Sequence, residues 1–131
     1  MPKDSESALL SVARCRTELM QELVRLRADW LPDAPPPTVA MGALGAALVR
    51  VLPEATQQDL QCLAETVEEI LRSGTEQSKN AVATGFLEAV VARSNSTPEV
   101  VCFTKVLGPL AREYCREWDK FTGCRTPGLW D

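Results

Sequence analysis

The sequence contains no histidine among its 131 residues. Histidine is the commonest general base in enzymes, because its pKa lies near neutral pH. Other catalytic patterns are missing as well: no serine lies in a Gly-x-Ser-x-Gly context, and no glycine-rich loop resembles a phosphate-binding cradle. Neighbouring acids such as Glu68 and Glu69 would point about 100° apart on a helix, which suits solvation better than acid–base catalysis. We therefore predict that the protein is not an enzyme.

Paired cysteine spacing is also absent. The five cysteines are an odd number, and none of them forms a Cys-x-x-Cys motif. Structural metal sites normally use paired cysteines and histidines, so we predict no metal and no other cofactor. We expect buried, reduced thiols of the kind found in the cytosol. The cysteines are Cys15, Cys62, Cys102, Cys115 and Cys124.

Long hydrophobic runs are missing too. The longest, residues 39–49, has 11 residues including two glycines, whereas a helix that crosses a bilayer needs about 20 apolar residues. The polar start of the chain lacks the apolar segment of a signal peptide. We therefore expect a cytoplasmic protein without a membrane partner.

No stripe of basic residues is present, as a nucleic-acid-binding surface would require. Several of the basic residues near the C-terminus adjoin acids, as in the pairs Arg112-Glu113, Arg116-Glu117 and Asp119-Lys120. We predict no nucleic-acid partner. The pattern leaves the oligomeric state open.

Apolar residues recur at spacings of three and four along the chain, and no segment alternates convincingly between apolar and polar residues. This pattern predicts an all-α, single-domain bundle spanning residues 1–131, with about five helices. The helices are expected at residues 6–30, 39–52, 54–73, 76–93 and from 98 to about 121, with a kink or a break near Gly108. Residues 39–52 should form the most buried helix, and residues 54–93 a helical hairpin that turns at Gly74. We expect a flexible N-terminus at 1–5, a proline-rich connection at 32–37 and a C-terminal tail at 124–131 that packs back onto the bundle.

The net charge of −4 arises entirely within residues 53–79, where six acids face only Arg72 and Lys79. Elsewhere the acidic and basic residues balance. Four of the acids lie opposite the apolar face of the helix expected at 54–73: Glu54, Glu65, Glu68 and Glu69. A local negative surface of this kind favours docking of a basic protein, and it is alternatively a solvated helix face.

A second polar line follows the next helix, where Asn80, Thr84 and Glu88 are four residues apart. Three interpretations remain open. The line is a solvent-facing strip, or it is part of the partner surface, or Glu88 is partly buried. In the last case its carboxylate is held by an arginine such as Arg112 or Arg116, or by a hydroxyl donor such as Tyr114 or Thr84. The aromatic residues near the C-terminus are expected in the core: Tyr114, Trp118, Phe121 and Trp130.

Two segments resemble a known group of proteins. They are residues 80–89, Asn-Ala-Val-Ala-Thr-Gly-Phe-Leu-Glu-Ala, and residues 107–130, which begin Leu-Gly-Pro-Leu-Ala-Arg-Glu-Tyr-Cys and end Pro-Gly-Leu-Trp. Both are similar to small all-helical bacterial proteins that look like the immunity proteins of polymorphic toxin loci. The similarity covers about residues 45–130.

The resemblance implies a cytoplasmic immunity protein that binds and neutralises a cognate toxin domain. Such an inhibitor requires no cofactor and no catalytic residues. The alternative is a helical adaptor, or a secretion-associated chaperone or scaffold, which would have the same composition. The candidate partner-binding residues are Glu54, Glu65, Glu68, Glu69, Asn80, Thr84 and Glu88.

Overall fold

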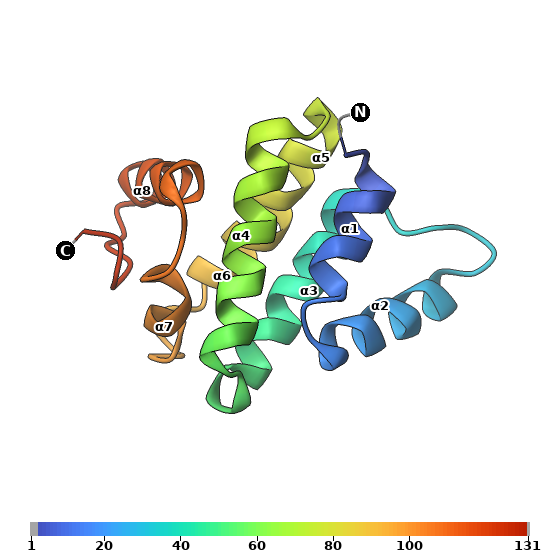
Figure 1. Ribbon diagram of the computed structural model, residues 1–131, viewed down its shortest axis with the longest axis horizontal. Helices are drawn as coiled ribbons and strands as arrows, with labels where there is room; N and C mark the ends of the chain where they lie inside the picture. Colours follow the sequence, from blue (N-terminus) through green and yellow to red (C-terminus); the bar gives the residue numbers. More distant parts are fainter. Residues whose placement is uncertain (1–2, 131) are drawn as a thin grey trace.

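The computed structural model describes residues 3–130, and every regular element in this range is a helix (Figure 1), which confirms the all-α prediction. The α-helices are α1 (Ser5–Ala13), α2 (Thr17–Trp30), α3 (Pro37–Val51), α4 (Gln57–Ser73), α5 (Glu76–Asn80), α6 (Glu88–Val91), α7 (Val100–Thr104) and α8 (Pro109–Thr122). A 3₁₀ turn, η1 (Leu52–Glu54), joins α3 to α4, and a π-helical segment, η2 (Ala81–Leu87), joins α5 to α6. Within residues 3–130, no helix combines the length and the apolarity needed to cross a membrane.

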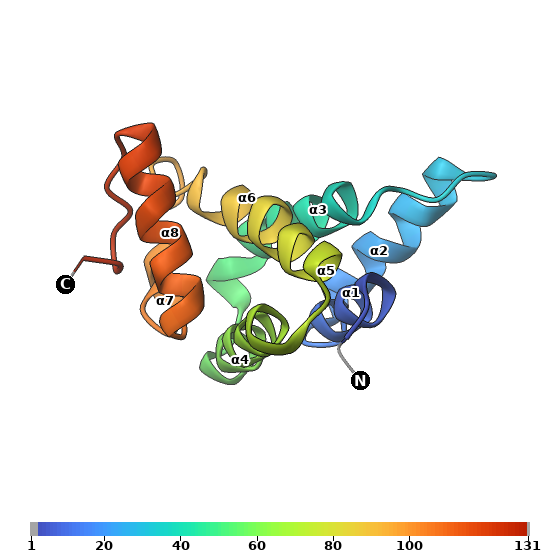
Figure 2. The same cartoon turned by 90° about the horizontal axis from the view of Figure 1, so that it is seen from above.

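The centre of the molecule is the contact between α3 and η2. Helices α1 and α2 lie on one side of this pair, α4 lies in front of it in Figure 1, and α7 and α8 lie at the opposite end (Figures 1 and 2). Six of the seven residues of η2 are buried, compared with seven of the 15 residues of α3. Of the five segments expected as helices, residues 39–52 have the largest buried share, eight of 14 residues, which agrees with the expectation. The short segment η2 is buried more completely still, because α4 and α8 cover it as well as α3.

Glycines allow the backbones of α3 and η2 to approach each other closely. A Cβ atom added at Gly85 would lie 2.6 Å from the carbonyl oxygen of Thr38 and 2.8 Å from Cβ of Met41. A Cβ atom at Gly45 would lie 2.7 Å from the carbonyl oxygen of Phe86. By contrast, a Cβ atom at Gly42 would meet only the Gly85 carbonyl oxygen, at an ordinary contact distance of 3.8 Å.

These contacts predict opposite effects for two substitutions of the same kind. Gly85→Ala should lower the free energy of unfolding by about 1–3 kcal/mol, because backbone atoms that cannot move independently must separate. Gly42→Ala should raise it by about 0.5–1 kcal/mol, because alanine is the better helix former and has room. Urea denaturation of both variants measures the difference. Equal effects at the two positions would contradict a close contact centred on Gly85.

The helix expected at residues 6–30 is two helices, α1 and α2, separated by a turn at residues 14–16. Arg16 is the one residue that interrupts the apolar stripe of this segment. A continuous helix would place its charge among the buried residues. Instead the chain turns, and Nη1 of Arg16 lies 2.5 Å from a carboxylate oxygen of Asp59 on α4. Helix α2 then packs on α1 and α3.

Other boundaries follow local capping signals. Helix α4 begins at Gln57 because Thr56 and Asp59 form a capping box, which leaves Glu54 outside the helix in η1. The expected fifth helix divides into α7 and α8, with Gly108 as the N-cap residue and Pro109 at the start of α8. Of the N-terminal stretch 1–5, expected to be flexible, residues 1 and 2 lie outside the described residues. The carbonyl oxygen of Lys3 accepts hydrogen bonds from the Thr75 N–H and the Ser78 hydroxyl.

The C-terminal tail is held by buried polar contacts with α8. Asp119 is fully buried and accepts hydrogen bonds from the backbone N–H and hydroxyl of Thr126, both at 2.7 Å, and from the Trp130 indole N–H at 2.8 Å. The guanidinium of Arg112 donates to the Gly128 carbonyl, and Leu129 is fully buried.

Two expectations about burial are wrong. Phe121, expected in the core, is 90% exposed, because it lies on the outer face of α8 near its end. Of the five cysteines, which are all free thiols, only Cys115 is buried.

Candidate functional site

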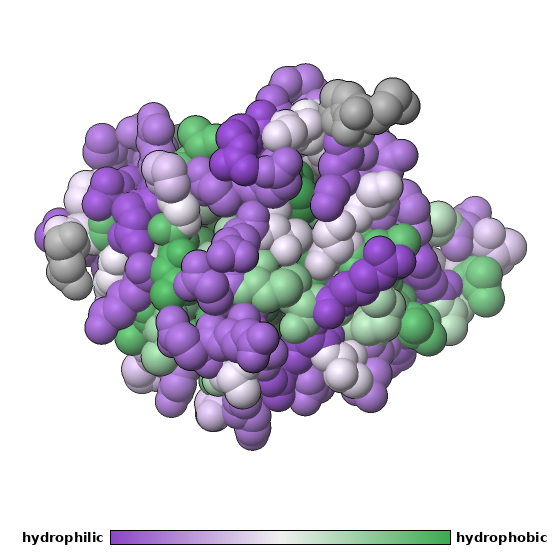
Figure 3. All heavy atoms as spheres, in the orientation of Figure 1, coloured by the Kyte–Doolittle hydropathy of each residue, from purple (hydrophilic) through white to green (hydrophobic). Residues whose placement is uncertain are grey.

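Three of the predicted partner-binding acids are exposed to solvent. Glu65 and Glu69 are exposed on α4, and Glu54 is exposed on η1. Figure 3 shows hydrophilic residues along much of the outer side of α4. Glu69 pairs with Arg72 one turn later, and this hydrogen bond lowers the pKa of the Glu69 carboxyl. An exposed pair of this kind contributes little to stability and leaves both groups accessible.

Glu68 does not belong to this exposed face, which corrects the sequence-based assignment. Its carboxylate is half-buried and accepts hydrogen bonds from the backbone N–H groups of Leu110 at 2.9 Å and Ala111 at 3.1 Å. These N–H groups lie in the first turn of α8, where backbone donors lack partners within the helix and a negative charge is favourable. A Cβ atom at Gly108 would lie only 2.6 Å from this carboxyl group. Glu68 therefore joins α4 to the start of α8.

The line Asn80–Thr84–Glu88 divides into two parts. Asn80 and Thr84 are exposed, and the Thr84 hydroxyl donates to the Asn80 carbonyl oxygen at 2.7 Å. Glu88 is half-buried and accepts a hydrogen bond from the Tyr114 hydroxyl on α8. Burial, and then this hydrogen bond, raises the pKa of Tyr114.

Of the candidate partners of a partly buried Glu88, the Tyr114 hydroxyl is the one that binds it, because both candidate arginines have other acceptors. Arg112 donates to the carbonyl oxygens of Thr104 and Gly128, and Arg116 donates to the carbonyl oxygen of Leu129. Carbonyl oxygens of the C-terminal tail thus accept hydrogen bonds from both guanidinium groups.

The residues that the structure leaves exposed form two groups on different arms of the helical hairpin. Glu54, Glu65 and Glu69 belong to η1 and α4, whereas Asn80 and Thr84 belong to α5 and η2. In Figure 1, α4 lies in front of the rod formed by α5, η2 and α6. The candidate site reduces to the exposed carboxylates on the α4 side, which we call the acidic surface (Glu54, Glu65 and Glu69).

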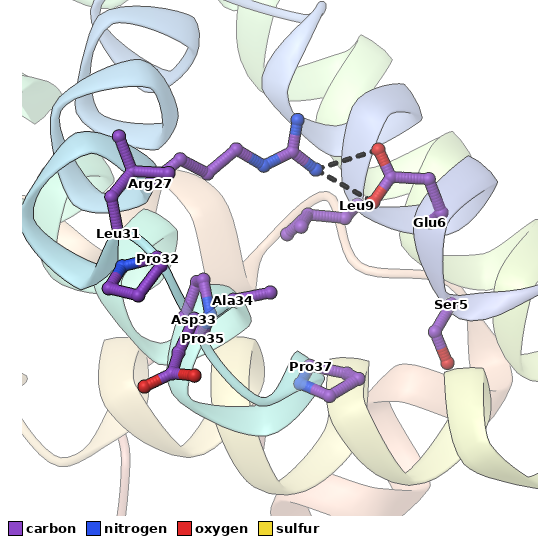
Figure 4. A pocket seen from close by; sticks show the side chains of 10 residues that line it. All are labelled: Ser5, Glu6, Leu9, Arg27, Leu31, Pro32, Asp33, Ala34, Pro35 and Pro37. Atoms are coloured by element: carbon purple, nitrogen blue, oxygen red, sulfur yellow. Dashed lines mark hydrogen bonds and ion pairs between the residues drawn. The ribbon is translucent and has the colours of Figure 1, made fainter.

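A hollow of about 400 Å³ lies between the start of α1 and the connection from α2 to α3 (Figure 4). Its wall includes Leu31 and three prolines of the connection. One amino group of the Arg27 side chain lies 2.7 Å from both carboxylate oxygens of Glu6. The hollow therefore contains this ion pair and an apolar wall, and the carboxylate of Asp33 also lines it.

Sequence reasoning missed this hollow because it treated residues 6–30 as one straight helix. In a straight helix, Glu6 and Arg27 would lie about 30 Å apart at a rise of 1.5 Å per residue. The turn at residues 14–16 brings them together. The signal that could have revealed the turn is the charged Arg16 in the middle of an otherwise apolar stripe.

The outer face of α2 exposes apolar side chains that sequence reasoning also missed. Val24 is 62% exposed, and Leu31, just beyond the end of α2, is 71% exposed. Trp30, the last residue of α2, is 38% exposed. A shallow hollow of about 330 Å³ follows this face and includes Met20 and Arg25.

The surface exposes carboxylates on α4 and apolar side chains on α2. A comparison with protein-family models, with curated proteins and with solved structures finds no significant match to this chain.

Proposed function

We propose that this protein is a non-enzymatic, cytoplasmic binding protein that neutralises a toxin domain, as an immunity protein does. The observation that carries the proposal is the acidic surface, where Glu54, Glu65 and Glu69 face solvent in the region that holds the whole net charge of −4. The resemblance of residues 80–89 and 107–130 to immunity-like proteins supports the same conclusion.

The proposed partner is a basic toxin domain. An enzyme that acts on nucleic acids needs a positively charged cleft for the phosphate backbone, and a negative surface complements such a cleft. Charges of opposite sign accelerate the encounter of two proteins before any close contact forms. The acidic surface therefore acts chiefly on the association rate and on the choice of partner, whereas close packing determines how long the complex lasts.

Reversing charge on the acidic surface tests this proposal. The double variant Glu65→Lys/Glu69→Lys should associate with the toxin domain on the order of tenfold more slowly and with a weaker dependence on salt. Long-range attraction is screened over about 8–10 Å at physiological ionic strength, so the difference should shrink as salt is added. Stopped-flow association at two salt concentrations and protection of toxin-expressing cells are the measurements.

The matched control is Glu113→Lys/Glu117→Lys on α8. Both residues are exposed, and the change in net charge is the same, but the location differs. The control should protect cells more fully than the α4 variant. Exposed substitutions usually change stability by less than about 0.5 kcal/mol, so both variants should fold. If the α4 variant protects and associates like the parent at both salt concentrations, the acidic surface is only a solvated helix face.

A second candidate function, a helical adaptor or secretion-associated chaperone, is favoured by the exposed apolar face of α2. Protein interfaces commonly bury an apolar centre inside a polar rim, and Val24 beside Arg25 and Gln21 has this composition. Purification of bound proteins from the native organism separates the two candidates. An adaptor should lose its partner when Val24 and Leu31 are changed to serine, and it should keep the partner after the charge reversal on α4. The proposed inhibitor should keep its partner after the serine substitutions and bind it more weakly after the charge reversal.

A further inference from the structure

Two cysteine thiols from distant parts of the chain lie against each other on the surface. Cys15 belongs to the turn between α1 and α2, and Cys62 belongs to α4. Their Sγ atoms are 2.7 Å apart, although the residues are 47 positions apart in sequence. A disulfide bond has an S–S length of about 2.05 Å, and sulfur atoms in ordinary non-bonded contact lie farther apart than these two.

Contacts one turn before and one turn after Cys62 hold the two thiols next to each other. One turn before Cys62, Asp59 pairs with Arg16 at 2.5 Å, and one turn after it, the Thr66 hydroxyl lies 3.5 Å from Sγ of Cys15. Asp59, Cys62 and Thr66 are three and four residues apart, so they lie on one stripe of α4 that faces the turn. Two independent side-chain contacts therefore fix the position of the turn against α4, and the thiols meet between them.

The two thiols differ in exposure. Cys62 is exposed, whereas Cys15 is half-buried. Burial, and then the contact with Cys62, raises the pKa of the Cys15 thiol to about 12. A thiolate is the attacking species in thiol–disulfide exchange. Cys62 is therefore the sulfur that meets an oxidant from solution, and Cys15 is placed to attack second.

We propose that Cys15 and Cys62 form a modification site at which a small disulfide, of the glutathione disulfide class, oxidises the pair to an intramolecular disulfide. The Cys62 thiolate attacks one sulfur of the oxidant, forms a mixed disulfide and releases a glutathione thiolate. That thiolate takes up the Cys15 proton. The Cys15 thiolate then attacks Sγ of Cys62 and releases the second glutathione. Two protein thiols are oxidised, and one glutathione disulfide is reduced to two glutathione molecules.

The product is a covalent link between the α1–α2 turn and α4. It closes a loop of 47 residues and so restricts the unfolded chain, which stabilises the folded state. The three other thiols have no part in the reaction: Cys115 is buried, and the structure gives no thiol partner to Cys102 or Cys124. This inference is independent of the proposed toxin-binding function, because it concerns only contacts within the chain.

The test exposes the reduced, full-length protein to glutathione disulfide and follows intact mass, free thiols and peptide masses. The parent should lose two hydrogen atoms and retain no glutathione on this pair. A peptide joining Cys15 to Cys62 should appear, and the number of titratable thiols should fall from five to three. The melting temperature should rise by about 5 °C or more and return to its starting value after reduction.

Variants separate the two steps. Cys15→Ser should stop at the mixed disulfide and carry one glutathione on Cys62, whereas Cys62→Ser should neither form the link nor gain stability. The double variant Cys102→Ser/Cys124→Ser keeps the pair and should behave as the parent does. The peptide map of the parent decides the question even if a variant fails to fold. A parent that carries glutathione on Cys62 without closing the link, or that forms only intermolecular disulfides, would overturn the proposal.

Discussion

Replacing Phe86 by alanine is expected to lower the free energy of unfolding by about 3–5 kcal/mol. Phe86 lies on η2, is fully buried, and packs edge-to-face against Phe103 of α7, with ring centroids 6.1 Å apart and an interplanar angle of 82°. The substitution removes the buried ring and leaves a cavity between the central helices and α7. It also removes an aromatic pair, which contributes about 0.5–1.5 kcal/mol beyond its buried area.

The chain provides a matched control for this substitution. Phe121→Ala makes the same chemical change at a residue that is 90% exposed, and it should alter stability by less than about 0.5 kcal/mol. Chemical denaturation followed by circular dichroism measures both variants. Small domains have a total stability of about 5–15 kcal/mol, so Phe86→Ala should also raise the unfolded fraction at 37 °C. Similar losses at the two positions would show that Phe86 is not at the centre of the core.

Replacing Asp119 by alanine is expected to cost about 3 kcal/mol and to release the C-terminal tail. The fully buried carboxylate accepts three hydrogen bonds, two from Thr126 and one from Trp130. Removing it leaves these donors without their partner, and each buried unsatisfied donor costs about 1–3 kcal/mol. The tail then retains the contacts of Leu129 and the arginines of α8, but loses the group that fixes Thr126.

Limited trypsin digestion can detect release of the tail separately from global unfolding. Arg125 is exposed and directly precedes Thr126, whose backbone N–H is bound to Asp119 in the parent. Cleavage after Arg125 should be faster in Asp119→Ala under conditions in which the helices remain folded. The control is Glu117→Ala on the same helix, where the carboxylate is exposed and pairs only with Lys120. Unchanged cleavage in Asp119→Ala would mean that the tail is held without this carboxylate.

The acidic residues show how far a helical pattern can predict a site. Periodicity placed Glu65, Glu68 and Glu69 away from the apolar stripe, and for Glu65 and Glu69 the structure agrees. Glu68 lies near the edge of that face, and whether such an edge position is exposed depends on the neighbouring helix. Here α8 begins beside it and supplies two backbone donors. No local pattern near Glu68 indicates that α8, about 40 residues later, will pack there.

Glu88 shows the same limit of a local sequence pattern, here for the partner of a partly buried carboxylate. Its apolar neighbours made partial burial one of three interpretations, and burial requires a partner for the carboxylate. The pattern offered arginines and hydroxyl groups on the C-terminal helix as partners. The choice of Tyr114 follows from the tail, which passes close to Arg112 and Arg116 and binds both guanidinium groups through its carbonyl oxygens.

The sequence by itself determined the helical class, the interruption near Gly108 and the location of the net charge, because each of these depends on residues within a few positions of one another. The tertiary structure alone decided the turn at residues 14–16, the use of Glu68 as a cap for α8, the hollow beside Arg27 and the meeting of Cys15 with Cys62. Each of these contacts joins residues far apart in the chain. Such contacts form only when helices pack, and packing depends on the shapes of whole faces rather than on any local sequence pattern.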